Sequence, residues 1–311
     1  MTASRLHGVR DRASAIDRLN FGFLTIVMAI AAAARRRLPH PLQAALAYAA
    51  LLTLLYAVGR FRASSVSPRW KAIALFVYAA LFMFAVYESF ALVMPYFRAA
   101  RYDELLTRID HALLGVHPTV WLERVTAPWL TDLLYGLYFF YFPMPLFVLV
   151  PMFVRGRFDD LERWIFAFLC CYYGAYLICF FLPAEGPRFH PPPGQSLPLV
   201  GVFLAAPIRD FINTLEPNKL DAFPSLHAAI LTMTMLLAWY EARRTFWIFV
   251  PLAAGVTLSL VYCRYHYVID VIAGVIWAFV AFTFARVVQP RLRARSAPHF
   301  GSLPALGGGL R

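Results

Sequence analysis

The sequence predicts an all-α integral membrane protein, a polytopic helical bundle of about eight transmembrane helices. Composition is the first reason: of 311 residues, 61% are hydrophobic and 15% are charged, and mean hydropathy is +0.62. An average soluble domain carries about 25% charged residues, so this chain has too little charge to cover a soluble globule of its size. The high hydrophobicity also excludes intrinsic disorder.

The spacing of apolar segments is the second reason. A helix needs roughly 20 mostly apolar residues to cross a bilayer. The predicted spans are residues 20–34, 41–59, 71–97, 130–154, 162–183, 223–241, 246–263 and 268–287. The first span is short and rich in alanine, so a helix lying in the membrane interface remains an alternative for it.

We divide the chain into three regions. Residues 1–70 are an N-terminal segment with two candidate spans, and residues 71–287 are one membrane domain with six spans. Residues 288–311 are a basic tail that we expect to be disordered. Two connections in the membrane domain are long: 98–129 has an amphipathic pattern, and 184–222 is rich in proline and glycine. Loops of this length are uncommon unless they are functional or disordered.

The net charge of +12 is interpreted as a record of orientation. In a soluble protein it would suggest nucleic acid, but in a membrane protein Lys and Arg concentrate in cytoplasmic loops. Eight spans put both long loops on one side and most short-loop charges on the other. We therefore expect a plasma (inner) membrane protein with its long loops outside and no nucleic-acid partner. Arg35, Arg36 and Arg37 contradict this orientation. If the first segment does not cross, they lie on the same side as the N-terminus, and the basic residues on the two sides become nearly equal in number.

Chemistry-bearing residues gather where three predicted spans meet the long-loop side. They lie in residues 183–188, which follow the fifth span, in 223–227, which open the sixth, and in 262–270, which join the seventh to the eighth. Because all three segments lie on the same side of the membrane, they can converge on one site.

His266 and Asp270 are four positions apart, a spacing that places two side chains on one face of a helix. A carboxylate on one imidazole nitrogen fixes the tautomer and leaves the other nitrogen free to attack. The pair therefore resembles a nucleophile and its orienting partner. The alternative, which this spacing alone does not exclude, is a structural polar pair that ties two helices together.

His227 lies in the first turn of the sixth predicted span, with Pro224 at the first helical position, which suits proline. A helix N-terminus offers free N–H groups and a positive dipole end to a phosphate, and Ser225 could add a hydroxyl. The imidazole of His227 could act as general acid on a departing alkoxide. Taken alone, His227 is better explained as an interfacial histidine facing water.

Three basic residues in or near these segments are candidates for binding a phosphate: Arg188, Arg264 and Lys219. A guanidinium fork is always charged and matches phosphate oxygens, although ordinary interfacial arginines are common. Histidines and cations together predict in-line phosphoryl transfer, in which one histidine takes the phosphoryl group and the other protonates the departing oxygen. The sequence has no carboxylate cluster suited to Mg²⁺, so we expect neither a metal nor another cofactor.

Over residues 100–287 the pattern resembles the type-2 phosphatidic acid phosphatase superfamily. The resemblance rests on the segment Pro-Ser-Leu-His at 224–227 and on Arg-Tyr-His-Tyr-Val-Ile-Asp at 264–270, in that order after Gly-Pro-Arg at 186–188. It implies a membrane helical bundle and metal-independent phosphatase or phosphotransferase activity on a lipid phosphate or phospholipid. It also implies a phosphohistidine intermediate.

The resemblance assigns roles to four residues. His266 matches the nucleophile, Asp270 its orienting partner, His227 the general acid and Arg188 the phosphate-binding arginine of the first motif. A protein of another class remains the alternative, namely a non-catalytic lipid-binding, carrier or scaffold protein with the same fold.

Three positions depart from the standard phosphatase pattern. Phe181 stands where that branch has a lysine, Leu260 where it has an arginine, and Leu226 where it has a glycine. The Pro-Ser-Leu-His form resembles instead the inositol phosphorylceramide synthase branch, which moves a phosphoryl head group between lipids (an inositolphosphotransferase). Transfer to a lipid hydroxyl is therefore favoured, although water can resolve the same intermediate.

Other polar residues have secondary interpretations. Glu88 falls within a predicted span, where an acid is costly, so it has a functional or a packing role. Asp110 could line the mouth of the site, although a solvated helix face explains it better. Tyr135, Tyr138 and Tyr141 recur at helical spacing and form either the wall of a lipid cleft or, as we favour, an aromatic packing stripe.

Overall fold

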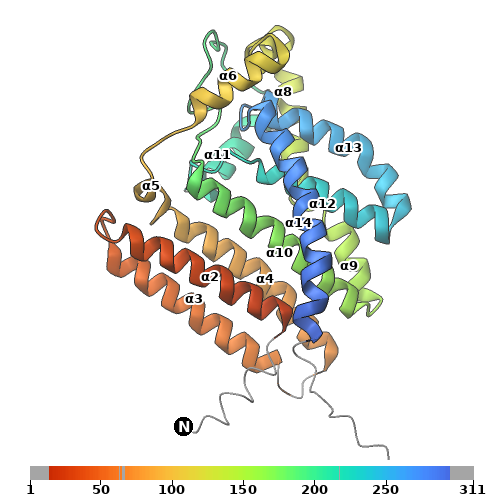
Figure 1. Ribbon diagram of the computed structural model, residues 1–311. Coiled ribbons are helices and arrows are strands. Elements are labelled where there is room, and N and C mark those ends of the chain that lie inside the picture. Colours follow the sequence, from red (N-terminus) through yellow and green to blue (C-terminus); the bar gives the residue numbers. More distant parts are fainter. Residues whose placement is uncertain (1–13, 63, 65–66, 217, 295–311) are drawn as a thin grey trace, which may run out of the picture.

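A computed structural model describes residues 14–62, 64, 67–216 and 218–294, and Figure 1 shows their arrangement. These residues form thirteen α-helices and one 3₁₀ helix, with no strand among them. Six helices are long and apolar enough to cross a membrane. They are α2 (Ala15–Ala34), α3 (Pro41–Arg62), α4 (Pro68–Phe90), α10 (Phe158–Phe181), α13 (Arg243–Tyr262) and α14 (Val268–Ala294). The prediction of an all-α polytopic membrane protein is confirmed.

Two of the eight predicted spans take other forms. The fourth, 130–154, is two short helices, α8 (Pro128–Phe140) and α9 (Leu146–Val154). Pro143 and Pro145 lie in the turn between them, where each lacks the N–H that a continuous helix needs. The sixth is α12 (Leu226–Glu241), which has only 16 residues. The count of eight spans is therefore not established, and α14 extends beyond its predicted end at 287; residues 295–311 of the predicted tail lie outside the described part.

The N-terminal helices α2 and α3 pack beside α4 on one flank of the bundle (Figure 1). The first begins with a capping box, in which the Ser14 hydroxyl accepts from the Asp17 N–H and the Asp17 carboxylate accepts from the Ser14 N–H. Buried Asn20 then bridges to the core, donating to the hydroxyl of Tyr78 on α4 and accepting from that of Tyr173 on α10. The two additional helices are thus joined to the rest of the bundle by polar as well as apolar contacts.

The centre of the bundle is formed by α10, α12 and α14. Of the six candidate spans α10 is the most buried, with 67% of its apolar stretch inside the protein. Gly274 on α14 lies against the start of α12, where a Cβ would collide with the backbone carbonyl of Ser225. This close approach holds the first turn of α12 beside the first turns of α14.

The two ends of the bundle differ in character. At one end, ion pairs Arg62–Asp17 and Arg157–Glu241 join the termini of long helices. The opposite end carries both long connections, folded into short helices. These are α5 (Met94–Phe97), α6 (Asp103–Leu114), α7 (Pro118–Leu122), the 3₁₀ helix η1 (Glu123–Val125) and α11 (Ala205–Leu215). Figure 1 shows α6 lying across this second end.

Candidate active site

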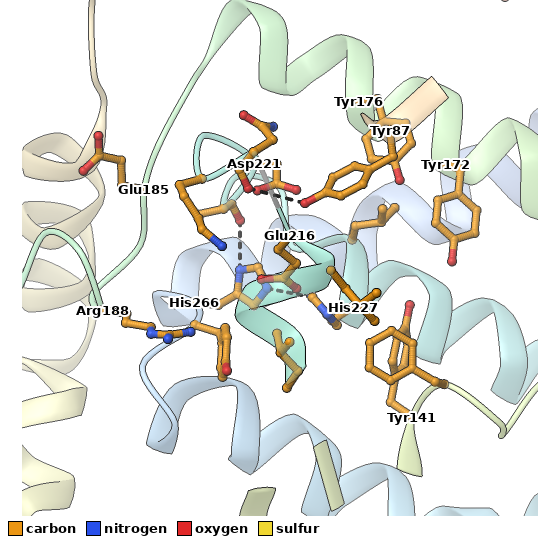
Figure 2. A pocket seen from close by; sticks show the side chains of 18 of the residues that line it. Tyr87, Tyr141, Tyr172, Tyr176, Glu185, Arg188, Glu216, Asp221, His227 and His266 are labelled. Carbon is orange, nitrogen blue, oxygen red and sulfur yellow. Dashed lines mark hydrogen bonds between the residues drawn. The ribbon is translucent and has the colours of Figure 1, made fainter. Parts of the chain in front are cut away.

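A cavity of about 320 Å³ opens at the end that carries the long connections (Figure 2). Its walls come from α4, α10, the turn between α8 and α9, and the segments on either side of α11. Four of the sequence-predicted residues line it: Arg188, Lys219, His227 and His266. Tyrosines from α4, the α8–α9 turn and α10 form its other wall, which gives the cavity one polar and one largely aromatic side.

The two histidines face each other in this cavity. Nδ1 of His227 lies 3.1 Å from Nε2 of His266, although they are 39 positions apart in the sequence. On its other side, Nδ1 of His266 lies 2.9 Å from the backbone carbonyl oxygen of Ala222. Figure 2 draws both contacts.

These contacts fix the tautomer of His266. A carbonyl oxygen can only accept, so the proton of neutral His266 is on Nδ1 and Nε2 keeps its lone pair. Burial lowers the pKa of His266 to about 4, against the opposing effects of the Ala222 carbonyl and the Asp221 carboxylate. His266 is therefore neutral near pH 7, with a nucleophilic nitrogen beside the cavity.

Arg188 supplies a cation to the same cavity. One guanidinium nitrogen donates to the Oδ1 atom of Asn213 at 2.5 Å, and the guanidinium lies 5.1 Å from the centre of the Tyr265 ring. The other terminal nitrogen, Nη1, is buried with no hydrogen-bond partner among the described residues. Lys219 lies nearby, 5.8 Å from the Phe189 ring centre. A buried guanidinium N–H without a partner suits an anionic oxygen from a ligand.

This geometry agrees with a comparison against known families. A family model described as PAP2 superfamily matches residues 104–284, more than half of the chain. The chain belongs to the PAP2 superfamily. No curated protein and no solved structure matches it. Membership supports an enzyme of the lipid phosphatase type that acts on lipid phosphates, and the matched range includes the whole cavity end from α6 onward.

In this PAP2 protein Asp270 does not orient His266 in the way that the spacing suggests. His266 lies before α14 begins at Val268, so the two residues do not share a helical face. The Asp270 carboxylate is fully buried, accepts from the Tyr267 N–H at 2.9 Å and lies 3.7 Å from Nδ1 of His266. The Ala222 carbonyl accepts the hydrogen bond from the imidazole instead, and the Asp270 carboxyl lies beside it without such a bond.

Two further candidates have structural partners instead of facing the cavity. Arg264 pairs with Glu123 at 2.7 Å and donates to the Leu197 carbonyl, and it is not among the described residues that line the cavity. Nor is Ser225, whose hydroxyl accepts from the Ala228 N–H and caps α12. The expectation that Pro224 begins this helix was wrong, because Ser225 is the N-cap and Pro224 precedes it.

The loop that carries Arg188 is fixed by backbone contacts. Ala184 and Asp221 form an isolated parallel bridge, so the two ends of the 184–222 connection lie side by side. The carboxylate of Asp103 on α6 accepts from the N–H groups of Glu185 and Gly186. Gly186 has a positive φ of 83°, and a Cβ there would collide with the Tyr265 carbonyl, so glycine is required just before the arginine.

Two more aspartates hold segments of the site, and sequence reasoning missed both roles. Asp110 on α6 accepts from the N–H groups of Val268 and Ile269, which begin α14 next to His266. It is 2% exposed, so the expected solvated face was wrong. Asp132 on α8 accepts from four successive N–H groups, at 202–205, and so fixes the start of α11. Each carboxylate satisfies N–H groups that a helix start leaves unpaired.

Two carboxylates in the cavity were also missed. Glu216 and Asp221 line it on either side of Lys219 in the sequence. Burial, reinforced by the charge of Asp221, raises the pKa of Glu216 to about 8, and burial also raises the pKa of Asp221. Among the described residues, no group of three or more His, Cys, Asp or Glu side chains is placed to hold a metal ion. The acidic residues around Lys219 in the sequence were the available signal.

Proposed function

We propose that this protein is a lipid phosphatase or phosphotransferase that works through a phosphohistidine on His266. The observation that carries the proposal is the unprotonated Nε2 of His266, which faces Nδ1 of His227 at the edge of a cavity that also contains Arg188, while the Ala222 carbonyl keeps the ring proton on Nδ1. The nucleophile is thus neutral, fixed in orientation and close to a cation that suits phosphate.

The reaction has two steps, and His227 gives up a proton in the first and takes one up in the second. In the first, Arg188 and Lys219 hold the phosphoryl oxygens, Nε2 of His266 attacks phosphorus, and the bond to the leaving oxygen breaks. His227 has by then taken up a second proton, which the phosphate charge stabilises, and it gives one proton to the leaving oxygen. The Asp270 carboxyl lies 3.7 Å from Nδ1 of the His266 ring that is phosphorylated in this step.

In the second step an acceptor hydroxyl takes the place of the leaving group. Neutral His227 removes the proton of that hydroxyl as its oxygen attacks phosphorus, and the phosphorus–nitrogen bond of His266 breaks. Water as acceptor gives a phosphatase, and a lipid hydroxyl gives a phosphotransferase. The Pro-Ser-Leu-His motif at 224–227 favours transfer of a phosphoryl head group to a second lipid, as in the inositol phosphorylceramide synthase branch.

The test compares purified wild-type protein with His266→Ala and His227→Ala. Each variant should lose at least about 10³-fold in kcat on lipid phosphates and phospholipids, and wild type alone should form an acid-labile, base-stable phosphoprotein. Free phosphate and new lipid product are measured side by side, which identifies the acceptor. Full turnover by folded His266→Ala protein would overturn the mechanism, and lipid binding without turnover by wild type would favour a carrier or scaffold.

We also propose that the cavity faces the extracytoplasmic side. Nine basic residues lie in or beside the short connections at the opposite end of the bundle, as the positive-inside rule requires of a cytoplasmic face, against Arg35, Arg36 and Arg37 in a short connection at the cavity end. The nine are Arg60, Arg62, Arg69, Lys71, Arg155, Arg157, Arg163, Arg243 and Arg244. Single cysteines at exposed positions 196 and 69 should react with a membrane-impermeant reagent in intact cells only at 196; labelling at 69 alone would reverse the orientation.

A further inference from the structure

The hydrogen-bond chain through the two histidines continues to a residue outside the cavity. The Tyr138 hydroxyl lies 2.7 Å from Nε2 of His227. Tyr138 is fully buried on α8, and it is not among the described residues that line the cavity. Its contact with the substrate is therefore indirect, through His227.

The direction of every hydrogen bond in the chain follows from its fixed end. The Ala222 carbonyl must accept, so Nδ1 of His266 donates and Nε2 accepts. The partner of that Nε2 is Nδ1 of His227, which must donate. In neutral His227 the second nitrogen then has no proton, so Nε2 accepts and the Tyr138 hydroxyl donates.

We propose that Tyr138 is a positioning residue that holds Nδ1 of His227 toward His266 and the reacting phosphate. Its hydroxyl donates to Nε2 of resting neutral His227, which places the ring proton on Nδ1, and it accepts from Nε2–H once His227 has taken up a second proton. The effect on catalysis rests on the proposed function. The tautomer of resting His227 can be measured without any turnover. Without the hydroxyl, neither the resting tautomer nor the orientation of the His227 ring is fixed, so Nδ1 and its proton are less often directed at the leaving oxygen. The effect parallels that of a carboxylate that holds a catalytic imidazole in one tautomer.

The surrounding packing makes Tyr138→Phe a clean substitution. The Tyr138 ring stacks on Tyr265 with centroids 4.5 Å apart, and phenylalanine retains that contact. The matched control is Tyr135→Phe, one helical turn earlier on α8: Tyr135 is equally buried and its ring lies 6.3 Å from that of Tyr265. The control therefore removes a buried hydroxyl from the same helix without touching the chain of hydrogen bonds.

The kinetic test uses the leaving group. Tyr138→Phe should slow single-turnover cleavage of a short-chain alkyl lipid phosphate about 10- to 100-fold, because an alkoxide needs a proton to depart. Cleavage of 4-nitrophenyl phosphate, whose phenolate departs without one, should change less than about twofold, and KM should stay close to wild type. In a His227→Ala background Tyr138→Phe should have no further effect. Equal slowing of both substrates, or equal effects of Tyr135→Phe, would overturn the inference.

A spectroscopic test needs no turnover. In protein labelled with ¹⁵N-histidine, the His227 resonances, assigned with His227→Gln, should report a protonated Nδ1 and an unprotonated Nε2, and Tyr138→Phe should add the opposite tautomer. A protonated Nε2 in resting neutral wild type would overturn the inference by itself. Turnover retained by His266→Ala would instead overturn the proposed function and leave the tautomer result standing, so the two failures are distinguishable.

Discussion

The N-terminal helix pair and the cavity end use buried polar groups in different ways. In α3 only 17% of the apolar stretch is buried, and the polar contacts of the pair include a cap, an ion pair and the Asn20 bridge. At the cavity end, Asp103, Asp110 and Asp132 are each at most 5% exposed and bind backbone N–H groups of distant segments. Polar groups join whole helices in one region and fix the position of individual loops in the other.

The difference shows what a buried carboxylate is for in this bundle. A carboxylate removed from water is costly unless several donors satisfy it. Asp103 and Asp110 both come from α6, and their partners begin the Arg188 loop and the α14 start beside His266. The short helix α6 thereby holds two motifs in register, so disrupting it should affect chemistry, whereas disrupting the N-terminal pair should affect stability alone.

The largest expected loss of activity distinguishes two arginines, Arg188 and Arg264, that the sequence alone presents as equal candidates for binding phosphate. Arg188→Ala should lower kcat/KM for a lipid phosphate about 100-fold or more, because it removes the guanidinium whose buried Nη1 has no hydrogen-bond partner among the described residues. Arg264→Ala should stay within about threefold of wild type in activity while its melting temperature falls, since its partners are Glu123 and a loop carbonyl. Comparable losses of activity from both would contradict the assignment.

A smaller effect should come from the carboxylate that begins α14. Asp110→Ala leaves the N–H groups of Val268 and Ile269 without their acceptor, and it should lower kcat about tenfold by loosening His266. The matched control at the other end is Asp17→Ala, which removes part of the α2 cap and should cost about 1 kcal/mol of stability with kcat unchanged. Kinetics and thermal unfolding in detergent measure both variants. A lower kcat in Asp17→Ala, or an unchanged kcat in Asp110→Ala, would contradict the proposal that buried polar groups support chemistry at the cavity end and only stability at the other end.

Local sequence patterns predicted much of this architecture but less of the site. Hydropathy placed both ends of α10 and α13 and the start of α14 within a few residues, because a span is a local property of the chain. The break between α8 and α9 had a signal, Pro143 and Pro145, that the hydropathy window averaged away.

The site residues show the same division between those that a local motif predicts and those that depend on distant partners. The short motifs contain His227 and His266, and the structure brings both to one cavity. The tasks of Asp110, Asp132 and Tyr138 depend on partners 70 to 160 positions away, as in the pairing of Asp110 with Val268, 158 positions on. No window along the chain contains both members of such a pair.

The state of protonation of His266 should set the acid limit of activity. Its folded pKa of about 4 lies below its ordinary value of 6.5, so kcat/KM should fall by half near pH 4 and about tenfold per further unit as the nucleophile is protonated. The unfolded chain binds this proton first, so the free energy of unfolding should fall as pH drops from 6.5 to 4 and level off below. The control is His266→Ala, whose stability should lack this part of the pH dependence; an unchanged curve would contradict the assignment.

The smallest expected effect is a loss of stability in the N-terminal helix pair that leaves catalysis unchanged. Asn20→Leu removes hydrogen bonds of 2.7 Å to both Tyr78 and Tyr173 and leaves two buried hydroxyls, so it should cost about 1 kcal/mol of stability with kcat unchanged. Changing both tyrosines to phenylalanine in the same protein should restore most of that loss, because no buried polar atom then lacks a partner. Thermal unfolding in detergent measures the series. A loss of kcat in Asn20→Leu would mean that the helix pair supports the cavity end, and the two regions would then be one functional unit.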